Sequence, residues 1–436
     1  MKNRHHNRRG RVWHNFRREL YAAMTTPIAV SLVEGGFVGV LADKLFNVHP
    51  LMLALLTAAP ALGNVTSLFW ARLSAGRPKI RFIMGLQASI LITIGSIAFI
   101  PLTPLGQWWL AAAVIVTRCL LCGWVTARTT VWRVNYPRNI RARMTGRLTM
   151  TASVLLGMTS IMAAGMLDGD PGRFRLIYVA AVLVASIGIY VYSGIIVRHE
   201  ERHLREERDP GGAVRAQQAP TVTADHTRRS FPGMWAVLRS DVDYRDYMGW
   251  QMLLGFSNLM LEPVLIYLVS HKLQASYLAS IAITQAIPFV CIPLSMMFWA
   301  RRFDRLHVSQ YRILHSVCIG IAVVVVWIGA LFGSLVIIGL GRLLWGLTRG
   351  GGMLAWQLGA NDFASRQLVT VYMGVHVTLT GIRGAIAPFV GMLLYNGWAG
   401  TPFVGVGQSV FLISACGIFT AAAGFFRLSR RIAQKD

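Results

Sequence analysis

The sequence predicts an all-α integral membrane protein whose twelve transmembrane helices form two pseudo-symmetric six-helix bundles. The chain of 436 residues is 54% hydrophobic and only 14% charged, with a mean hydropathy of +0.51, a composition that soluble globular proteins rarely show. It contains twelve apolar runs that are long enough to cross a hydrocarbon core of about 30 Å as helices. In addition, the two halves of the chain carry matching residues at a nearly constant spacing.

The apolar runs follow one another with mostly short connections that are polar or rich in Pro and Gly. They are 22–46, 50–72, 80–102, 106–132, 144–167, 174–197, 247–270, 275–299, 310–331, 334–358, 368–395 and 402–426. A basic start precedes the first run without the short apolar core and cleavage site of a signal peptide, so we expect this run to be retained as a span. The long charged stretch predicts three parts: an N-terminal bundle over 1–198, a cytoplasmic central loop over 199–246 and a C-terminal bundle over 247–436.

A carboxylate lies in the middle of the first run of each half. Glu34 is followed by Gly35 and Gly36, and Glu262 is followed by Pro263, so a residue that weakens a helix comes after each acid. Further matches at similar spacing are Phe16 with Tyr244, Phe69–Arg72 with Phe298–Arg301, Arg118 with Arg342, Trp132 with Trp356, and Gly165 with Gly391. An ionised side chain at mid-membrane costs at least about 2.5 kcal/mol, so a functional role is the default hypothesis. Repeated halves that share a site are a common construction of secondary transporters.

Basic residues are concentrated in the connections on one side of the predicted membrane. The connections on the other side contain only Lys44, Arg173, Arg175 and Lys272. The positive-inside rule therefore places both termini and the central loop in the cytoplasm, and the expected location is the cell membrane, which in a bacterium is the inner membrane. The net charge of +25 is explained by this topology and by contact with lipid headgroups, so we expect no nucleic-acid partner.

Several motifs resemble those of the major facilitator superfamily, and the resemblance covers nearly the whole chain. Gly76-Arg77-Pro78-Lys79 is similar to the end of the superfamily's loop motif between helices 2 and 3, although Leu73 stands where that motif has an Asp. The second half keeps the acid as Asp304-Arg305. Arg118 and Arg342 resemble the fourth-helix Arg of proton-linked members, and Pro388–Gly391 resembles part of an exporter motif that normally lies in helix 5.

The resemblance implies that helices 1, 4, 7 and 10 line a cavity that opens to one side of the membrane at a time. These helices carry Glu34, Arg118, Glu262 and Arg342, and we expect Glu34 to pair with Arg118 and Glu262 with Arg342. The expected substrate- and proton-binding residues are Glu34, Arg118, Glu262, Arg342, Arg349 and Arg383, with uncharged contacts from Gln251, Asn258, Tyr267, Gln285 and Gln357; the expected gating residues are Arg72, Gly76, Arg77, Asp304 and Arg305. Arg128 is expected to extend toward the lipid headgroups.

Two interpretations of the buried charges remain open. A Glu that loses its Arg to a substrate anion would take up a proton, which couples transport to protons; alternatively, the pairs are permanent structural contacts within each bundle. The predicted function is a secondary active transporter that moves a small molecule by alternating access, with proton-coupled antiport and export preferred while import stays open; the alternatives are an uncoupled facilitator of the same fold and, more remotely, the metalloprotease considered below. We expect a monomer in the lipid bilayer whose partners are a small-molecule substrate and protons, with no cofactor, no metal and no catalytic residue.

One motif points to a different class of protein. His199-Glu200-Glu201-Arg202-His203 fits the His-Glu-x-x-His pattern of zinc metalloproteases. A zinc enzyme needs a third protein ligand and an enclosed site, whereas this segment is almost entirely charged. We therefore interpret it as a solvated helix stabilised by pairs of opposite charge.

Overall fold

The computed structural model describes residues 2–198, 200–208, 231–364, 368–398 and 400–434. These residues form helices and turns, and none of them is in a strand. They belong to two compact units: unit 1 comprises Met1–Val33, Leu62–Thr159 and Asp170–Thr223, and unit 2 comprises Glu34–Ala61, Ser160–Gly169 and Ala224–Asp436. The predicted central loop, 199–246, lies partly outside the described residues, because 199 and 209–230 are not among them.

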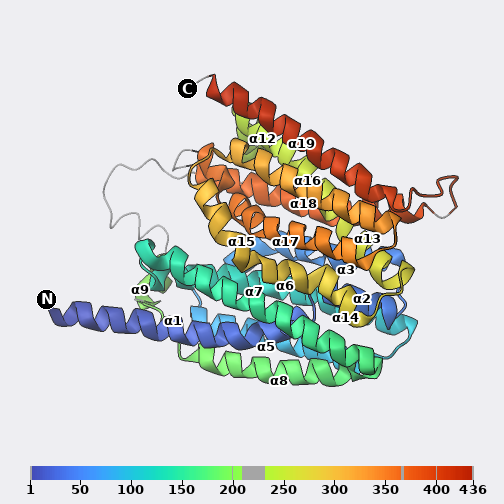
Figure 1. Ribbon diagram of the computed structural model, residues 1–436. Coiled ribbons are helices and arrows are strands. Elements are labelled where there is room, and N and C mark those ends of the chain that lie inside the picture. The colour runs from blue at the N-terminus through green and yellow to red at the C-terminus, as the bar shows by residue number, and fades with distance from the viewer. Residues whose placement is uncertain (1, 199, 209–230, 365–367, 399, 435–436) are drawn as a thin grey trace. The chain divides into compact units, whose positions relative to one another are not determined.

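Unit 1 consists of long helices that pack through apolar faces. They are α1 (Lys2–Ser31), the end of α3 (Pro50–Val65), α4 (Ser67–Ser74), α5 (Lys79–Ser96), the 3-10 helix η1 (Ile97–Phe99), α6 (Pro104–Asn135), most of α7 (Arg138–Gly169), η2 (Pro171–Arg173), α8 (Phe174–Ser193) and α9 (Glu200–Arg208). Helix α1 lies along α8, and α5 packs against both α6 and α8 (Figure 1). Phe16, Tyr136, Met144 and Leu148 form one buried cluster where α1, α6 and α7 meet.

Unit 2 contains the second half of the chain and two segments of the first, Glu34–Ala61 and Ser160–Gly169. Its helices are α2 (Gly35–Lys44), most of α3, the end of α7, α11 (Phe231–Ser240), α12 (Val242–Leu259), α13 (Leu261–Tyr267), the π-helix η4 (Leu268–Lys272), α14 (Tyr277–Ile281), the π-helix η5 (Ala282–Ala286), α15 (Ile287–Phe303), α16 (Val308–Leu331), α17 (Leu335–Leu358), the 3-10 helix η6 (Gly359–Asp362), α18 (Val369–Asn396) and α19 (Ser409–Ala433). Helix α16 packs between α17 and α19, and α2 packs against α13 and α14 (Figure 1).

The predicted membrane spans correspond to helices of the structure. Among the described residues, ten helices are long and apolar enough to cross a membrane, or eleven if α3 and α4, which are bent by 42° at their junction, form one broken span. Helix α17 covers the remaining predicted span with 24 residues. Outward-facing side chains such as Tyr190, 79% exposed, and Leu294, 72% exposed, fit a surface that lipid covers.

The first helix of each half is interrupted at its carboxylate. In the first half α1 ends at Ser31 and α2 begins at Gly35, and in the second half α12 ends at Leu259 and α13 begins at Leu261. The sequence predicted weak positions after each acid. In the structure the first break, 32–34, includes Glu34, and the second lies at Met260, two residues before Glu262. Discontinuous helices of this kind carry the substrate and ion sites of many transporters, because they expose backbone groups at mid-membrane.

Candidate functional site

The centre of the candidate site in unit 2 is an ion pair between Glu262 of α13 and Arg342 of α17. Arg342 Nη2 lies 3.9 Å from Glu262 Oε2, and the side chain of Glu262 is 29% exposed whereas that of Arg342 is 6% exposed. The structure therefore contains the pair expected for the second half. At this separation the two charges attract one another without a direct hydrogen bond.

Backbone carbonyls of the π-helix η5 hold the Arg342 guanidinium independently of Glu262. Arg342 Nε donates to the carbonyl oxygen of Ile283 at 3.2 Å, and Nη2 donates to that of Thr284 at 3.0 Å. A single π-helical turn inside an α-helix disturbs the regular hydrogen-bond ladder, and such turns are frequent at functional sites. Arg342 is consequently fixed by the fold, while Glu262 remains the more accessible and less constrained partner.

Aromatic and amide groups complete the surroundings of the pair. The Arg342 guanidinium lies over the Trp345 ring, 4.2 Å from its centroid, and Trp345 Nε1 donates to Asn258 Oδ1 at 2.8 Å. Glu262 and these three residues line a small cavity of about 20 Å³ together with apolar side chains of α13, α16 and α19. This volume accommodates about one water molecule, so the cavity can bring a proton acceptor to the carboxylate.

The N-terminus of α2 packs against the same π-helix. Gln285 Oε1 accepts a hydrogen bond from the Phe37 N–H at 2.7 Å, and Gln285 Nε2 donates to Ser160 Oγ at 2.5 Å. A Cβ atom at Gly36 would lie 2.8 Å from Gln285 Cβ and 3.1 Å from the Thr284 carbonyl, so only Gly permits this close approach. Glu34, the N-cap of α2, is thereby placed two residues from a glycine that contacts η5.

In unit 1, side chains bind the carbonyl groups that the break in the first helix leaves free. Arg118 Nη2 donates to the Val33 carbonyl at 2.6 Å, and the Tyr178 hydroxyl donates to the Leu32 carbonyl at 2.8 Å. Arg118 thus binds backbone at a helix irregularity, as its repeat counterpart Arg342 does. The pairing of Glu34 with Arg118 joins residues of the two units and stays a prediction.

The other two predicted binding residues have different surroundings. The Arg349 guanidinium lies over the rings of Phe289 and Trp345, at 4.3 and 5.4 Å from their centroids. It therefore belongs to the aromatic wall beside Arg342. Arg383, by contrast, is buried within unit 2, and its Nη1 donates to the Gln251 carbonyl at 2.5 Å.

The predicted gating loop of the first half is bound by a carboxylate that lies far away in the sequence. Leu73 replaces the usual Asp, and instead Glu207 of α9 forms an ion pair with Lys79 at 2.6 Å and accepts from the Gly76 N–H at 2.8 Å. Gly76 has a φ of +68°, a conformation that favours Gly. Arg72, in the last turn of α4, and Arg77, in the loop, are exposed, and Asp304 and Arg305 are exposed after α15.

A buried acid that the sequence analysis did not single out lies in unit 1. Glu19 of α1 is 3% exposed, and its Oε2 accepts from Trp132 Nε1. The Arg128 guanidinium lies 4.3 Å from the ring centroids of both Trp124 and Trp132, and its charge acts on Glu19. The expectation that Arg128 extends to headgroups is therefore wrong, because the guanidinium lies over the faces of two tryptophan rings. Burial raises the pKa of the neighbouring Tyr136, which stays protonated.

The segment that resembles a zinc motif contacts the predicted gating loop around Gly76 and Lys79. Glu200 Oε1 accepts from the Lys79 N–H at 3.1 Å, and helix α9 faces the loop before α5 through Glu200 and Glu207. Where residues are described, no three His, Cys, Asp or Glu side chains are close enough to hold a metal ion; His199 lies outside the described residues. These contacts give α9 a structural role.

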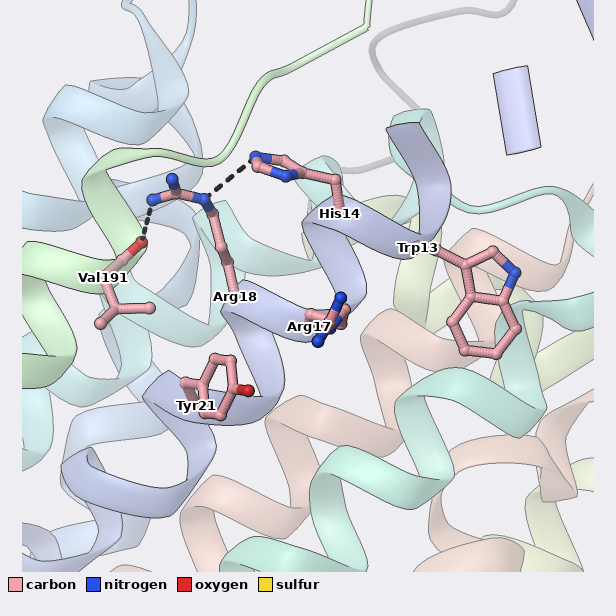
Figure 2. Close-up of a pocket in the computed structure, with 6 residues that line it drawn as sticks. All are labelled: Trp13, His14, Arg17, Arg18, Tyr21 and Val191. Carbon is pink, nitrogen blue, oxygen red and sulfur yellow. Dashed lines mark hydrogen bonds between the residues drawn. The ribbon is translucent and has the colours of Figure 1, made fainter. Parts of the chain in front are cut away.

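Figure 2 shows a larger hollow on the surface of α1. It has a volume of about 490 Å³ and is lined by Trp13, His14, Arg17, Arg18, Tyr21 and Val191. Arg18 donates to His14 Nε2 at 3.0 Å and to the Val191 carbonyl at 3.2 Å. Trp13 and Tyr21 are 51% and 52% exposed, and exposed aromatic rings beside Arg are typical of the membrane–water interface. Its lining contains none of the residues of α13 and α17 that surround Glu262 and Arg342.

Comparison with known proteins agrees with this architecture. Solved structures with the same fold include the nucleoside transporter NupG (12% identity, 95% of this chain and 99% of that one covered, TM-score 0.67) and a D-xylose–proton symporter (13%, 96% and 97%, 0.64). A POT family transporter in complex with 5-aminolevulinic acid is also similar (14%, 97% and 96%, 0.64), whereas no curated protein sequence matches. The model of the Major Facilitator Superfamily matches residues 20–388. The chain is therefore a membrane transporter of the major facilitator superfamily.

Proposed function

We propose that this protein is a proton-coupled secondary active transporter that exports a small molecule by alternating access. The observation that carries the proposal is the position of Glu262, which is partly accessible, next to a helix break and 3.9 Å from an Arg that the backbone already holds. Two unit charges about 4 Å apart attract by about 4 kcal/mol at an effective dielectric constant of about 20. Gaining or losing a proton at Glu262 therefore changes the energetics of the site substantially.

Competition for this carboxylate gives a physical route to antiport. When Glu262 carries a proton its charge is cancelled, and Arg342 keeps its bonds to the carbonyls of Ile283 and Thr284. A substrate with a cationic or hydrogen-bond-donating group binds the ionised form and displaces the proton. Proton and substrate then occupy the site alternately, which is the requirement for exchange in opposite directions.

The packing around Gly391 connects α18 to the helix break beside Glu262, and the resemblance of this segment to an exporter motif is the support for export. Gly391 lies in the Pro388–Gly391 segment of α18, which resembles part of an exporter motif. A Cβ atom at Gly391 would lie 1.9 Å from the carbonyl oxygen of Met260, the residue between α12 and α13. The glycine thus lets α18 contact the helix break directly, and movement of α18 can be transmitted to Glu262.

The experiment measures proton release in proteoliposomes that contain the purified chain and a pH-sensitive dye. The compounds added include nucleosides, pentoses, dipeptides, organic cations and organic anions. We expect at least one of them to release protons from the wild type, and Glu262→Gln to abolish the release. Glu201→Gln is the matched control, because Glu201 is an exposed acid on α9.

The other outcomes change the proposal in defined ways. Proton uptake on ligand addition would replace antiport by co-transport. Binding without proton movement in any background would favour the uncoupled facilitator. If Glu34→Gln abolishes proton release and Glu262→Gln does not, the proton-binding residue is Glu34, in the first half of the chain.

A further inference from the structure

The interior of unit 2 contains a group of basic residues that the proposed transport mechanism does not use. Arg312 of α16 and His376 of α18 are each 2% exposed, and Arg383 of α18 is 5% exposed. The charges of Arg312 and Arg383 act on one another, and both act on His376. Three basic side chains from two helices therefore share one buried region.

The partners of these residues are neutral. Arg312 Nη1 lies 3.3 Å from Nδ1 of His315, and Arg383 Nη1 donates to the backbone carbonyl of Gln251. Within the described part of the chain, no carboxylate forms an ion pair with Arg312, His376 or Arg383. A guanidinium does not lose its proton in a folded protein, and an uncompensated buried charge is strongly destabilising. The cluster therefore requires a counter-charge.

Polar atoms around the cluster also lack hydrogen-bond partners among the described residues. They are Nε of Arg312, Nε of Arg383, Nε2 of His376, the hydroxyl oxygen of Tyr247 and Oε1 of Gln251, all of them buried. Tyr247 is close enough to act electrostatically on Arg383. Buried polar groups are normally satisfied. The Nε–H groups of Arg312 and Arg383 and the Tyr247 hydroxyl can donate, whereas Gln251 Oε1 can only accept, so it is the unpartnered donors beside the uncompensated cations that point to an absent anionic occupant.

The first half of the chain shows how the same architecture compensates a buried guanidinium. The spacing that relates Glu34 to Glu262 also relates Glu19 to Tyr247. Glu19 supplies a buried carboxylate whose charge acts on Arg128. In the second half a neutral phenol takes the place of this carboxylate, although the surrounding charges are basic. The spacing that relates Arg118 to Arg342 places Gly352 opposite Arg128, so unit 2 lacks both members of this pair and carries its buried basic residues at other positions.

We propose that Arg312, His376 and Arg383 form an anion-binding site inside unit 2, with Tyr247 as an additional donor. Its ligand is a small anion, either an inorganic ion such as chloride or the carboxylate group of an organic solute, which share the chemistry that a guanidinium recognises. The bound anion compensates the positive charges that α16 and α18 place in the interior of unit 2. This role is separate from that of Glu262 and Arg342.

The test measures the thermal unfolding midpoint of the full chain in detergent at constant pH and ionic strength. Sodium Mes, whose sulfonate carries a bulky morpholine ring, is replaced stepwise by sodium chloride or sodium acetate. A ligand that binds only the folded state raises the midpoint with the logarithm of its concentration above its Kd. We expect such a rise with at least one of the two anions, and the more effective anion identifies the source. A midpoint that neither anion changes overturns the proposal.

Three variants separate a specific site from general charge effects. Tyr247→Glu places a carboxylate at the position that corresponds to Glu19, and we expect it to remove the anion dependence while proton release on substrate addition continues. Arg383→Gln should also remove the dependence. Arg427→Gln, which removes an equal charge from an exposed position on α19, should keep it. An unchanged anion response in Tyr247→Glu, or its loss in Arg427→Gln, contradicts the assignment.

Discussion

Replacing Arg342 by Met is expected to destabilise unit 2 more than any other single change at the candidate site. The variant keeps an unbranched side chain but removes the partner of Glu262 and the donor to the carbonyls of Ile283 and Thr284. Removing one member of a buried pair costs about 3–5 kcal/mol. Because the side chain of Glu262 is 29% exposed and keeps part of its hydration, we take a cost near the lower end of this range. Each carbonyl that loses its donor adds about 1 kcal/mol. We therefore expect a loss of about 5 kcal/mol in the free energy of unfolding.

A double-mutant cycle with Glu262→Gln tests the origin of this loss. Glu262→Gln leaves Arg342 bound to the two carbonyls, so it should cost less than Arg342→Met, and the double variant should be more stable than the sum of the single changes predicts. We expect a coupling energy of about 1–3 kcal/mol. The assay is equilibrium unfolding in mixed micelles, followed by tryptophan fluorescence. A loss below about 1 kcal/mol in Arg342→Met, or a coupling energy within about 0.5 kcal/mol of zero, would refute the reasoning.

Two further changes test packing and loop contacts. Gly391→Ala should destabilise the protein by about 1–3 kcal/mol and reduce transport, because the new Cβ would collide with the Met260 carbonyl. Gly165→Ala is the control at the corresponding place in the first half. Its Cβ meets open space, so this variant should be neutral or stabilising in the same unfolding assay. Glu207→Gln should weaken the contact of this side chain with Lys79 and with the Gly76 N–H, and should therefore increase hydrogen exchange at that N–H. Unchanged exchange would show that Glu207 does not hold the loop.

Much of the helical architecture could be predicted from features that are read along the sequence. The apolar runs predicted the spans because the hydrocarbon core demands about 20 apolar residues per helix, a requirement that can be counted along a sequence. Glu262 and Arg342 were identified because a charge in such a run is costly wherever its partner lies. The family was also recognised from the loop and helix motifs, and the match over residues 20–388 confirms it.

Features that depend on partners distant in sequence were not predicted. Glu19 precedes the first apolar run and looks like part of a basic flank, yet Trp132 and Arg128 enclose it. Likewise, nothing near Leu73 indicates that Glu207 supplies the missing carboxylate of the loop.

The sequence by itself determined the membrane class and the family, and it predicted a two-fold repeat and charges near mid-membrane, because these depend on composition and spacing. Only the tertiary structure decided which groups stabilise those charges. Arg342 is held by carbonyls that become available through a π-helical turn in a different helix, and the basic cluster of Arg312, His376 and Arg383 became evident only in the folded unit 2, where α16 and α18 both bury basic side chains. The energy of a buried charge depends on its neighbours in space, and a list of residues does not contain them.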